Sequence, residues 1–169
     1  MDLTGKIAAV AGGTGGIGMA SAIAMSKLGA SIVLIARNEE KLAKTIPVLD
    51  SSKNQQHQYL VADFSDSASL DVLCESISKL KIDILLNNTG GPAGGPITDA
   101  KPEEFLNTFN QHLIANHKIT QAVLTKMKEQ PYGRIINVIS TSVKAPLNGL
   151  GVSNTIRGAV ANWAKTMAN

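Results

Sequence analysis

A glycine-rich stretch near the start of the chain, Gly12-Gly13-Thr14-Gly15-Gly16-Ile17-Gly18, follows an apolar run and precedes a segment of helical periodicity. Glycines permit a tight turn and close approach of the main chain to a ligand, and the first turn of a helix offers unpaired N–H groups. A flexible surface loop is the alternative reading, because a glycine motif alone is weak evidence. A strand before it and a helix after it favour a diphosphate-binding loop.

Four further apolar runs are each followed by polar or small residues. These are Arg37-Asn38, Asp63, Asn87-Asn88-Thr89-Gly90 and Ser140-Thr141-Ser142. Ligands of open parallel sheets bind outside the carboxyl ends of the strands. Five such motifs at one edge of a sheet indicate an extended ligand lying across it.

The elements that must position these residues alternate along the chain. Strands are expected at 6–11, 31–36, 57–62, 81–86 and 134–139, and helices at 16–28, 39–50, 66–80, 103–128 (with a possible break) and 153–168. Alternating strands and helices are typical of a parallel sheet covered on both faces. We therefore predict a single α/β domain over 1–169, a doubly wound (Rossmann-type) sheet with strand order 3-2-1-4-5.

The composition excludes several classes of protein. With 44% hydrophobic and 17% charged residues the chain should fold, and its net charge of +3 with 4% aromatic residues gives little support to nucleic-acid binding. The one cysteine, Cys74, allows no internal disulfide. We find neither a signal peptide nor an apolar run long enough to span a membrane, so the cytoplasm is the expected location.

The spacing Gly12-x-x-x-Gly16-x-Gly18 and the tetrapeptide Asn87-Asn88-Thr89-Gly90 resemble the T-G-x-x-x-G-x-G and N-N-A-G patterns of the short-chain dehydrogenase/reductase family. The likeness extends over the whole chain, with Ala11 and Thr89 as small departures. It implies an oxidoreductase with a nicotinamide dinucleotide held by the glycine loop and the strand ends. The implied cofactor-binding residues are Gly12, Thr14, Gly15, Gly16, Ile17, Gly18, Arg37, Asn38, Asp63, Phe64, Asn88, Thr89 and Gly90.

Arg37 bears on the choice between NAD and NADP. An acid at the end of the second strand binds the ribose of NAD, whereas an arginine there accommodates the 2′-phosphate of NADP. The chain has Ala36-Arg37, so NADP(H) is favoured over NAD(H). Gly15 stands where NADP-preferring relatives often have a second base, and a solvated surface arginine is the alternative reading of Arg37. Asp63 is equally compatible with adenine binding and with helix capping, a role for which Ser65 competes.

The catalytic positions that the resemblance implies are substituted. Ser140 fits the family serine, but Ser153 and Arg157 stand at the Tyr and Lys of Y-x-x-x-K, and His112 at the family asparagine. An alkyl hydroxyl is far less acidic than a phenol, and arginine does not share protons at neutral pH, so Ser153 and Arg157 suit binding or polarisation better than proton relay.

Other side chains are candidates for the proton step. A histidine such as His112 titrates in a useful range. Lys144, in the loop after the fifth expected strand, is a second candidate. Packing of the histidine, solvation of the lysine and helix capping by Ser153 are the alternatives. No metal is expected, because His112 and His117 are five residues apart and not four.

The family continues with further strands and a lid that this sequence does not contain, so we expect a fragment of a longer chain. The expected function is NADP(H)-dependent hydride transfer to or from a small carbonyl or alcohol substrate, in a homo-oligomer (dimer or tetramer). A nucleotide-binding protein that has lost catalysis, acting as a sensor or structural partner, is the rival hypothesis.

Overall fold

The five apolar runs form one parallel sheet in the computed structural model, which describes residues 1–169. The strands are β1 (Ile7–Ala11), β2 (Ser31–Ala36), β3 (Gln58–Val61), β4 (Ile84–Asn87) and β5 (Arg134–Asn137). Their order, β3-β2-β1-β4-β5, confirms the prediction. The central strands are buried on both faces, which explains why their sequences lack polar alternation.

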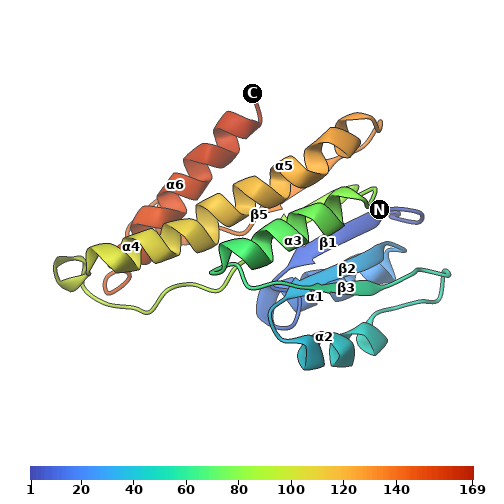
Figure 1. Cartoon of the computed structure of the whole chain (residues 1–169), viewed down its shortest axis with the longest axis horizontal. Coiled ribbons are helices and arrows are strands. Elements are labelled where there is room, and N and C mark those ends of the chain that lie inside the picture. Colours follow the sequence, from blue (N-terminus) through green and yellow to red (C-terminus); the bar gives the residue numbers. More distant parts are fainter.

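Helices cover both faces of this sheet. They are α1 (Gly16–Lys27), α2 (Glu39–Thr45), α3 (Ser67–Ser78), α4 (Pro102–Phe109), α5 (Ala115–Lys128) and α6 (Gly151–Met167), with 3₁₀ turns η1 (Ile46–Val48), η2 (Ile97–Asp99) and η4 (Thr141–Val143) and a π-helical segment η3 (Asn110–Ile114). Figure 1 shows α3, α5 and α6 on one side of the sheet and α1 and α2 on the other. None of these helices is long and apolar enough to cross a bilayer.

Each face has its own apolar core. Leu85 of β4 packs in the cluster that includes Ile77 of α3 and Ile119 of α5. On the opposite face, Leu34 of β2 packs with residues of α1 and α2, among them Leu42. The chain changes direction between β1 and β4, and this is the point of a doubly wound sheet where a crevice forms at the strand ends.

Strand β4 begins and ends later than predicted. The N–H group of Ile7 donates to the carboxylate of Asp83 at 2.9 Å, so a side chain takes the place of a ladder carbonyl at this point. The strand continues through Asn87, whose side chain is buried and donates to Asn137 on β5 at 2.9 Å. The first asparagine of Asn87-Asn88-Thr89-Gly90 therefore belongs to the sheet and not to the turn.

Three helix boundaries also differ from the prediction. Asp66, not Ser65, caps α3, because its carboxylate accepts from the N–H group of Ala68 at 3.0 Å. Pro47 lies in a 3₁₀ turn that follows the shorter α2. Helix α6 begins at Gly151, which places Ser153 inside the first turn and makes the capping interpretation wrong.

The loop between β4 and α4 is joined to the start of α6. The N–H group of Gly95 donates to the carbonyl of Gly149 at 2.7 Å, and that of Gly151 donates back to Gly95 at 3.2 Å. The amino-terminal half of α6 is packed through Val152, Ile156 and Val160. Its far end is less covered, and a cavity of about 400 Å³ lies between α5, α6 and β5.

Candidate functional site

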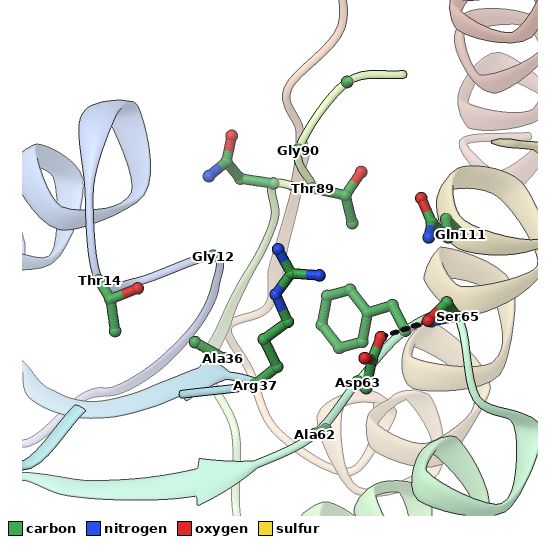
Figure 2. A pocket seen from close by; sticks show the side chains of 13 residues that line it. Gly12, Thr14, Ala36, Arg37, Ala62, Asp63, Ser65, Thr89, Gly90 and Gln111 are labelled. Carbon is green, nitrogen blue, oxygen red and sulfur yellow. Dashed lines mark hydrogen bonds between the residues drawn. The ribbon is translucent and has the colours of Figure 1, made fainter. Parts of the chain in front are cut away.

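A cavity of about 300 Å³ opens at the carboxyl ends of the first four strands (Figure 2). Its lining combines the glycine loop, the ends of β2 and β3, the turn after β4 and one residue of η3. The lining residues are Gly12, Thr14, Ala36, Arg37, Ala62, Asp63, Phe64, Ser65, Asn88, Thr89, Gly90, Gly91 and Gln111. Four of the five polar motifs recognised in the sequence thus converge on one site.

The glycine loop is packed on one side and open on the other. A β-carbon on Gly18 would overlap the carbonyl oxygen of Gly12 and lie 2.9 Å from Nδ2 of Asn88, so the loop closes tightly against the turn after β4. A β-carbon on Gly15 or Gly16 would have nothing within 4 Å. The loop is therefore not filled by its own side chains, and the open side adjoins the first turn of α1, which suits an anion.

Arg37 supplies the one guanidinium of the cavity. It is exposed at the end of β2 and forms no ion pair. Figure 2 shows its side chain reaching into the cavity toward Thr89. Asn38 is used differently, because its side-chain oxygen accepts from the N–H group of Lys41 at 2.8 Å and caps α2.

Asp63 is held by its own loop. Its carboxylate accepts from the N–H group and the hydroxyl of Ser65 at 2.9 and 2.6 Å. These bonds, assisted by the charge of Arg37, lower the pKa of Asp63, so the group is an anion and an acceptor at neutral pH. An ionised carboxylate in the cavity wall suits an amino group on the ligand. The structure gives Asp63 no helix-capping role.

Gln111 lines the cavity but was not among the site residues predicted from the sequence. It reaches the cavity from the π-helical segment η3, between α4 and α5. The only signal was the interrupted periodicity of 103–128, which suggested a broken helix without indicating which side chain would turn inward.

Behind the cavity wall lies a buried polar cluster of His112, Thr89 and Arg157. The hydroxyl of Thr89 is hydrogen bonded to Nδ1 of His112. The guanidinium of Arg157 donates to the carbonyl of Val138 at 2.8 Å and to that of Thr89 at 3.2 Å. Arg157 is 8% exposed and His112 is fully buried. Two of the three substituted catalytic positions are thus brought together, with Arg157 joining the ends of β4 and β5.

The imidazole of His112 is neutral. Burial, and next the positive charge of Arg157, lower its pKa from 6.5 to about 4, while the main chain of Gly90 acts in the opposite direction. A neutral imidazole of such low pKa is a poor proton donor at neutral pH. The candidate role of His112 in proton transfer therefore loses support.

This pKa predicts how stability depends on pH. The unfolded chain protonates His112 as the pH falls through about 6.5, whereas the folded chain does so only near 4. Stability is therefore lost as the pH falls between these values, by about 2 to 3 kcal/mol at about 1.4 kcal/mol per pKa unit.

Urea unfolding of the wild type and of His112→Gln at pH 7 and pH 4.5 would measure this effect. The loss on acidification should be smaller in the variant by about 2 kcal/mol, whatever its absolute stability. Equal losses in the two proteins would show that His112 is not held neutral.

The other catalytic candidates, Ser140, Ser153 and Lys144, do not line the cavity. Ser140 is half-buried after β5, and its oxygen accepts from the N–H group of Ser142 at 3.1 Å, which leaves its own hydrogen free to donate. Ser153 is half-buried in the first turn of α6. Lys144 is exposed just after η4.

The fold and the cavity define an α/β protein with an open cavity at the switch point of its sheet. The chain belongs to the short-chain dehydrogenase family, whose model matches residues 6–169. This match confirms the family predicted from the glycine and asparagine motifs. The family comprises NAD(P)-dependent oxidoreductases.

Individual relatives carry names of reductases. The chain is 34% identical over 141 residues to the 3-oxoacyl-(acyl-carrier-protein) reductase of Rickettsia felis, covering 83% of this chain and 56% of that protein. It is 32% identical over 166 residues to the very-long-chain 3-oxoacyl-CoA reductase of Mus musculus, covering 92% and 51%. The chain thus spans about half the length of these relatives.

The fold agrees with that of solved family members. The L-sorbose reductase of Gluconobacter frateurii, whose structure is a complex with NADPH and L-sorbose, superposes with a TM-score of 0.92 at 27% identity, covering 99% of this chain and 65% of that one.

Proposed function

We propose that the chain binds NADP(H) and takes part in hydride transfer between the nicotinamide and a small carbonyl or alcohol substrate. The carrying observation is Arg37, an unpaired guanidinium at the end of β2 in a cavity closed by the glycine loop. No acid stands at Ala36 or Arg37 to repel a 2′-phosphate, and a guanidinium binds phosphate through two parallel hydrogen bonds. The NADPH complex of the sorbose reductase supports the same cofactor.

The residues present fit this group. The open side of Gly15 and Gly16 has room for the diphosphate, Arg37 for the 2′-phosphate and Asp63 for an adenine amino group. When bound, the nicotinamide supplies or accepts a hydride. Ser140, with its hydrogen free, is the proposed donor to the substrate oxygen. The substrate oxygen would take its proton from water or from Lys144, whose side chain is exposed.

Turnover is tested by mixing the protein with NADPH and a panel of ketones and 3-oxoacyl thioesters and following the nicotinamide absorbance. For any substrate that reacts, Ser140→Ala should lower kcat roughly 100-fold, as loss of a hydrogen-bond donor to a developing oxyanion does. The exposed neighbour Thr141→Ala is the control and should react at the wild-type rate. A Ser140→Ala variant as fast as the wild type would remove Ser140 from the proposal.

Nucleotide binding without turnover is the second candidate. It is favoured by Arg157, which donates to two main-chain carbonyls, and by Ser153 in place of an acidic phenol. Tight binding of NADPH with no reaction across the panel would support this candidate over the enzyme. Self-association also remains a prediction, which light scattering of the purified chain would test.

A further inference from the structure

The loop between η4 and α6 contains the one Asn-Gly pair of the sequence, Asn148-Gly149. Both residues are exposed in a turn, and Gly149 has a positive φ of 73°. Neither the side chain of Asn148 nor the N–H group of Gly149 takes part in the hydrogen bonds of this loop. The side-chain amide and the main-chain nitrogen that follows it are therefore both free to react.

Asparagine is one of the thermolabile side chains of proteins, and a following glycine exposes it to attack because no β-carbon hinders the main-chain nitrogen. A bond forms between N of Gly149 and Cγ of Asn148, the Cγ–Nδ2 bond breaks, and the proton of the N–H group leaves with the amide nitrogen as ammonia. Water then opens the cyclic imide at either carbonyl. The products are aspartate and isoaspartate, and in isoaspartate the main chain runs through the former side chain and is longer by a methylene.

The turn is anchored on both sides of this pair. The carbonyl of Leu147 accepts from Nδ2 of Asn154 at 2.9 Å, and the carbonyl of Gly149 accepts from the N–H group of Gly95 at 2.7 Å. The second bond, with the return bond of 3.2 Å from Gly151 to Gly95, joins the loop after β4 to the first turn of α6. A main chain that is longer between the two anchors does not fit both of them.

The two products differ in what they change. A cavity of about 730 Å³, bounded by η2, the η4–α6 loop and α6, is lined by Asn148 and by no charged side chain. Aspartate and isoaspartate both add a carboxylate to this wall, but only isoaspartate also lengthens the main chain. The effect of charge and the effect of chain length can therefore be measured separately.

We propose that Asn148 is a site of spontaneous deamidation in the folded protein, and that isoaspartate at this position releases the β4–α4 loop from α6. The reaction consumes only the amide of the chain and water. Because α6 carries Ser153 and Arg157, the modification alters the support of two candidate catalytic residues. The proposal does not depend on which cofactor the chain binds.

Peptide mapping of the 169-residue chain, kept at about pH 8 and 37 °C, tests the reaction. Deamidation adds about 1 Da to the peptide that contains Asn148, and isoaspartyl methyltransferase adds a methyl group to the isoaspartate. Because no hydrogen bond must open first, the rate at Asn148 should lie within about tenfold of that in the same chain unfolded in urea. A folded chain that reacts more than about tenfold more slowly than this would overturn the proposal.

Two controls assign the reaction to the Asn-Gly pair. In Asn148→Gln the peptide that spans this position should stay unmodified over the same time. Asn54 is also exposed, with a φ of 63°, but it precedes Gln55, which has a β-carbon. It should therefore react at least about tenfold more slowly than Asn148 in the unfolded chain. Equal rates at Asn54 and Asn148 would contradict the role given to Gly149.

Amide hydrogen exchange tests the release of the loop, with isoaspartate-containing protein separated by ion exchange. The N–H groups of Gly95 and Gly151 form the bonds between the β4–α4 loop and α6, so they should exchange at least about tenfold faster than in fresh protein. Fresh Asn148→Asp carries the charge without the longer chain and should exchange like the fresh wild type. Unchanged exchange in the isoaspartate form, or equal acceleration in Asn148→Asp, would overturn the effect assigned to isoaspartate.

Discussion

Gly18→Ala should lower the free energy of unfolding by about 3 kcal/mol and abolish measurable NADP(H) binding. The new β-carbon would overlap the carbonyl oxygen of Gly12 and come within 2.9 Å of Nδ2 of Asn88. The carbonyl of Gly12 belongs to the main chain, and Asn88 lies in the turn after β4. Because neither neighbour is free to give way, the loop must move. Overpacking typically costs about 1 to 3 kcal/mol, and a main-chain clash lies at the upper end.

The matched control for this variant is Gly15→Ala, three residues earlier in the same loop. Gly15 is extended, with φ −173° and ψ 171°, and its β-carbon would meet nothing within 4 Å. Its melting temperature should stay close to that of the wild type, whereas Gly18→Ala should melt roughly 6 to 12 °C lower, at about 2 to 4 °C per kcal/mol. Equal melting temperatures of the two variants, measured by calorimetry, would contradict the packing described for the loop.

The fold was predictable because burial of the sheet on both faces leaves a clear pattern in the sequence of its strands. Strands covered on both faces read as apolar runs, and the helices between them begin and end at residues such as Asn38 and Gly29 that favour those positions. Boundaries were less predictable, since they depend on tertiary partners. The carboxylate of Asp83 accepts from the N–H group of Ile7, and Asp66 rather than Ser65 caps α3.

The cavity at the strand ends was also predictable in outline. The ends of parallel strands meet at one edge of a sheet, so Arg37, Asp63 and Asn88 had to lie near the glycine loop. Sequence alone could not separate cavity lining from local capping. Asn38 was counted with the cofactor residues, but the structure shows its side chain on the amino terminus of α2.

The surroundings of the candidate catalytic residues were the least predictable. Nothing in a helical pattern tells whether an arginine will reach a ligand or a main-chain carbonyl, because both lie at the same end of the sheet. Arg157 was expected to bind an anionic group or polarise a substrate oxygen, yet its fork joins β4 and β5. His112 was expected to titrate near neutrality, and burial beside Arg157 lowers its pKa to about 4. Tertiary burial decided both outcomes.

Arg37 should set the preference between the two dinucleotides. Hydrogen bonds to charged groups contribute about 1.5 to 3 kcal/mol, so Arg37→Ala should weaken NADP⁺ binding by roughly 10- to 140-fold. Arg37→Glu adds repulsion between the carboxylate and the 2′-phosphate, and the combined loss should reach about 1,000-fold, or about 4 kcal/mol. NAD⁺ lacks this phosphate, so its affinity should change less than fivefold in Arg37→Ala and should increase in Arg37→Glu, whose carboxylate can accept from the ribose 2′-hydroxyl.

Arg134→Ala is the matched control, because it removes the same charge at the opposite end of the sheet. Arg134 begins β5 and lies over the ring of Tyr132, 4.6 Å from its centroid. Calorimetric Kd values for NADP⁺ and NAD⁺ in 50 and 200 mM salt should be nearly those of the wild type for this variant. If Arg134→Ala weakened NADP⁺ binding as much as Arg37→Ala does, the effect of Arg37 would be one of net charge. A loss confined to Arg37 and to NADP⁺ would place the 2′-phosphate at the end of β2, where the guanidinium enters the cavity.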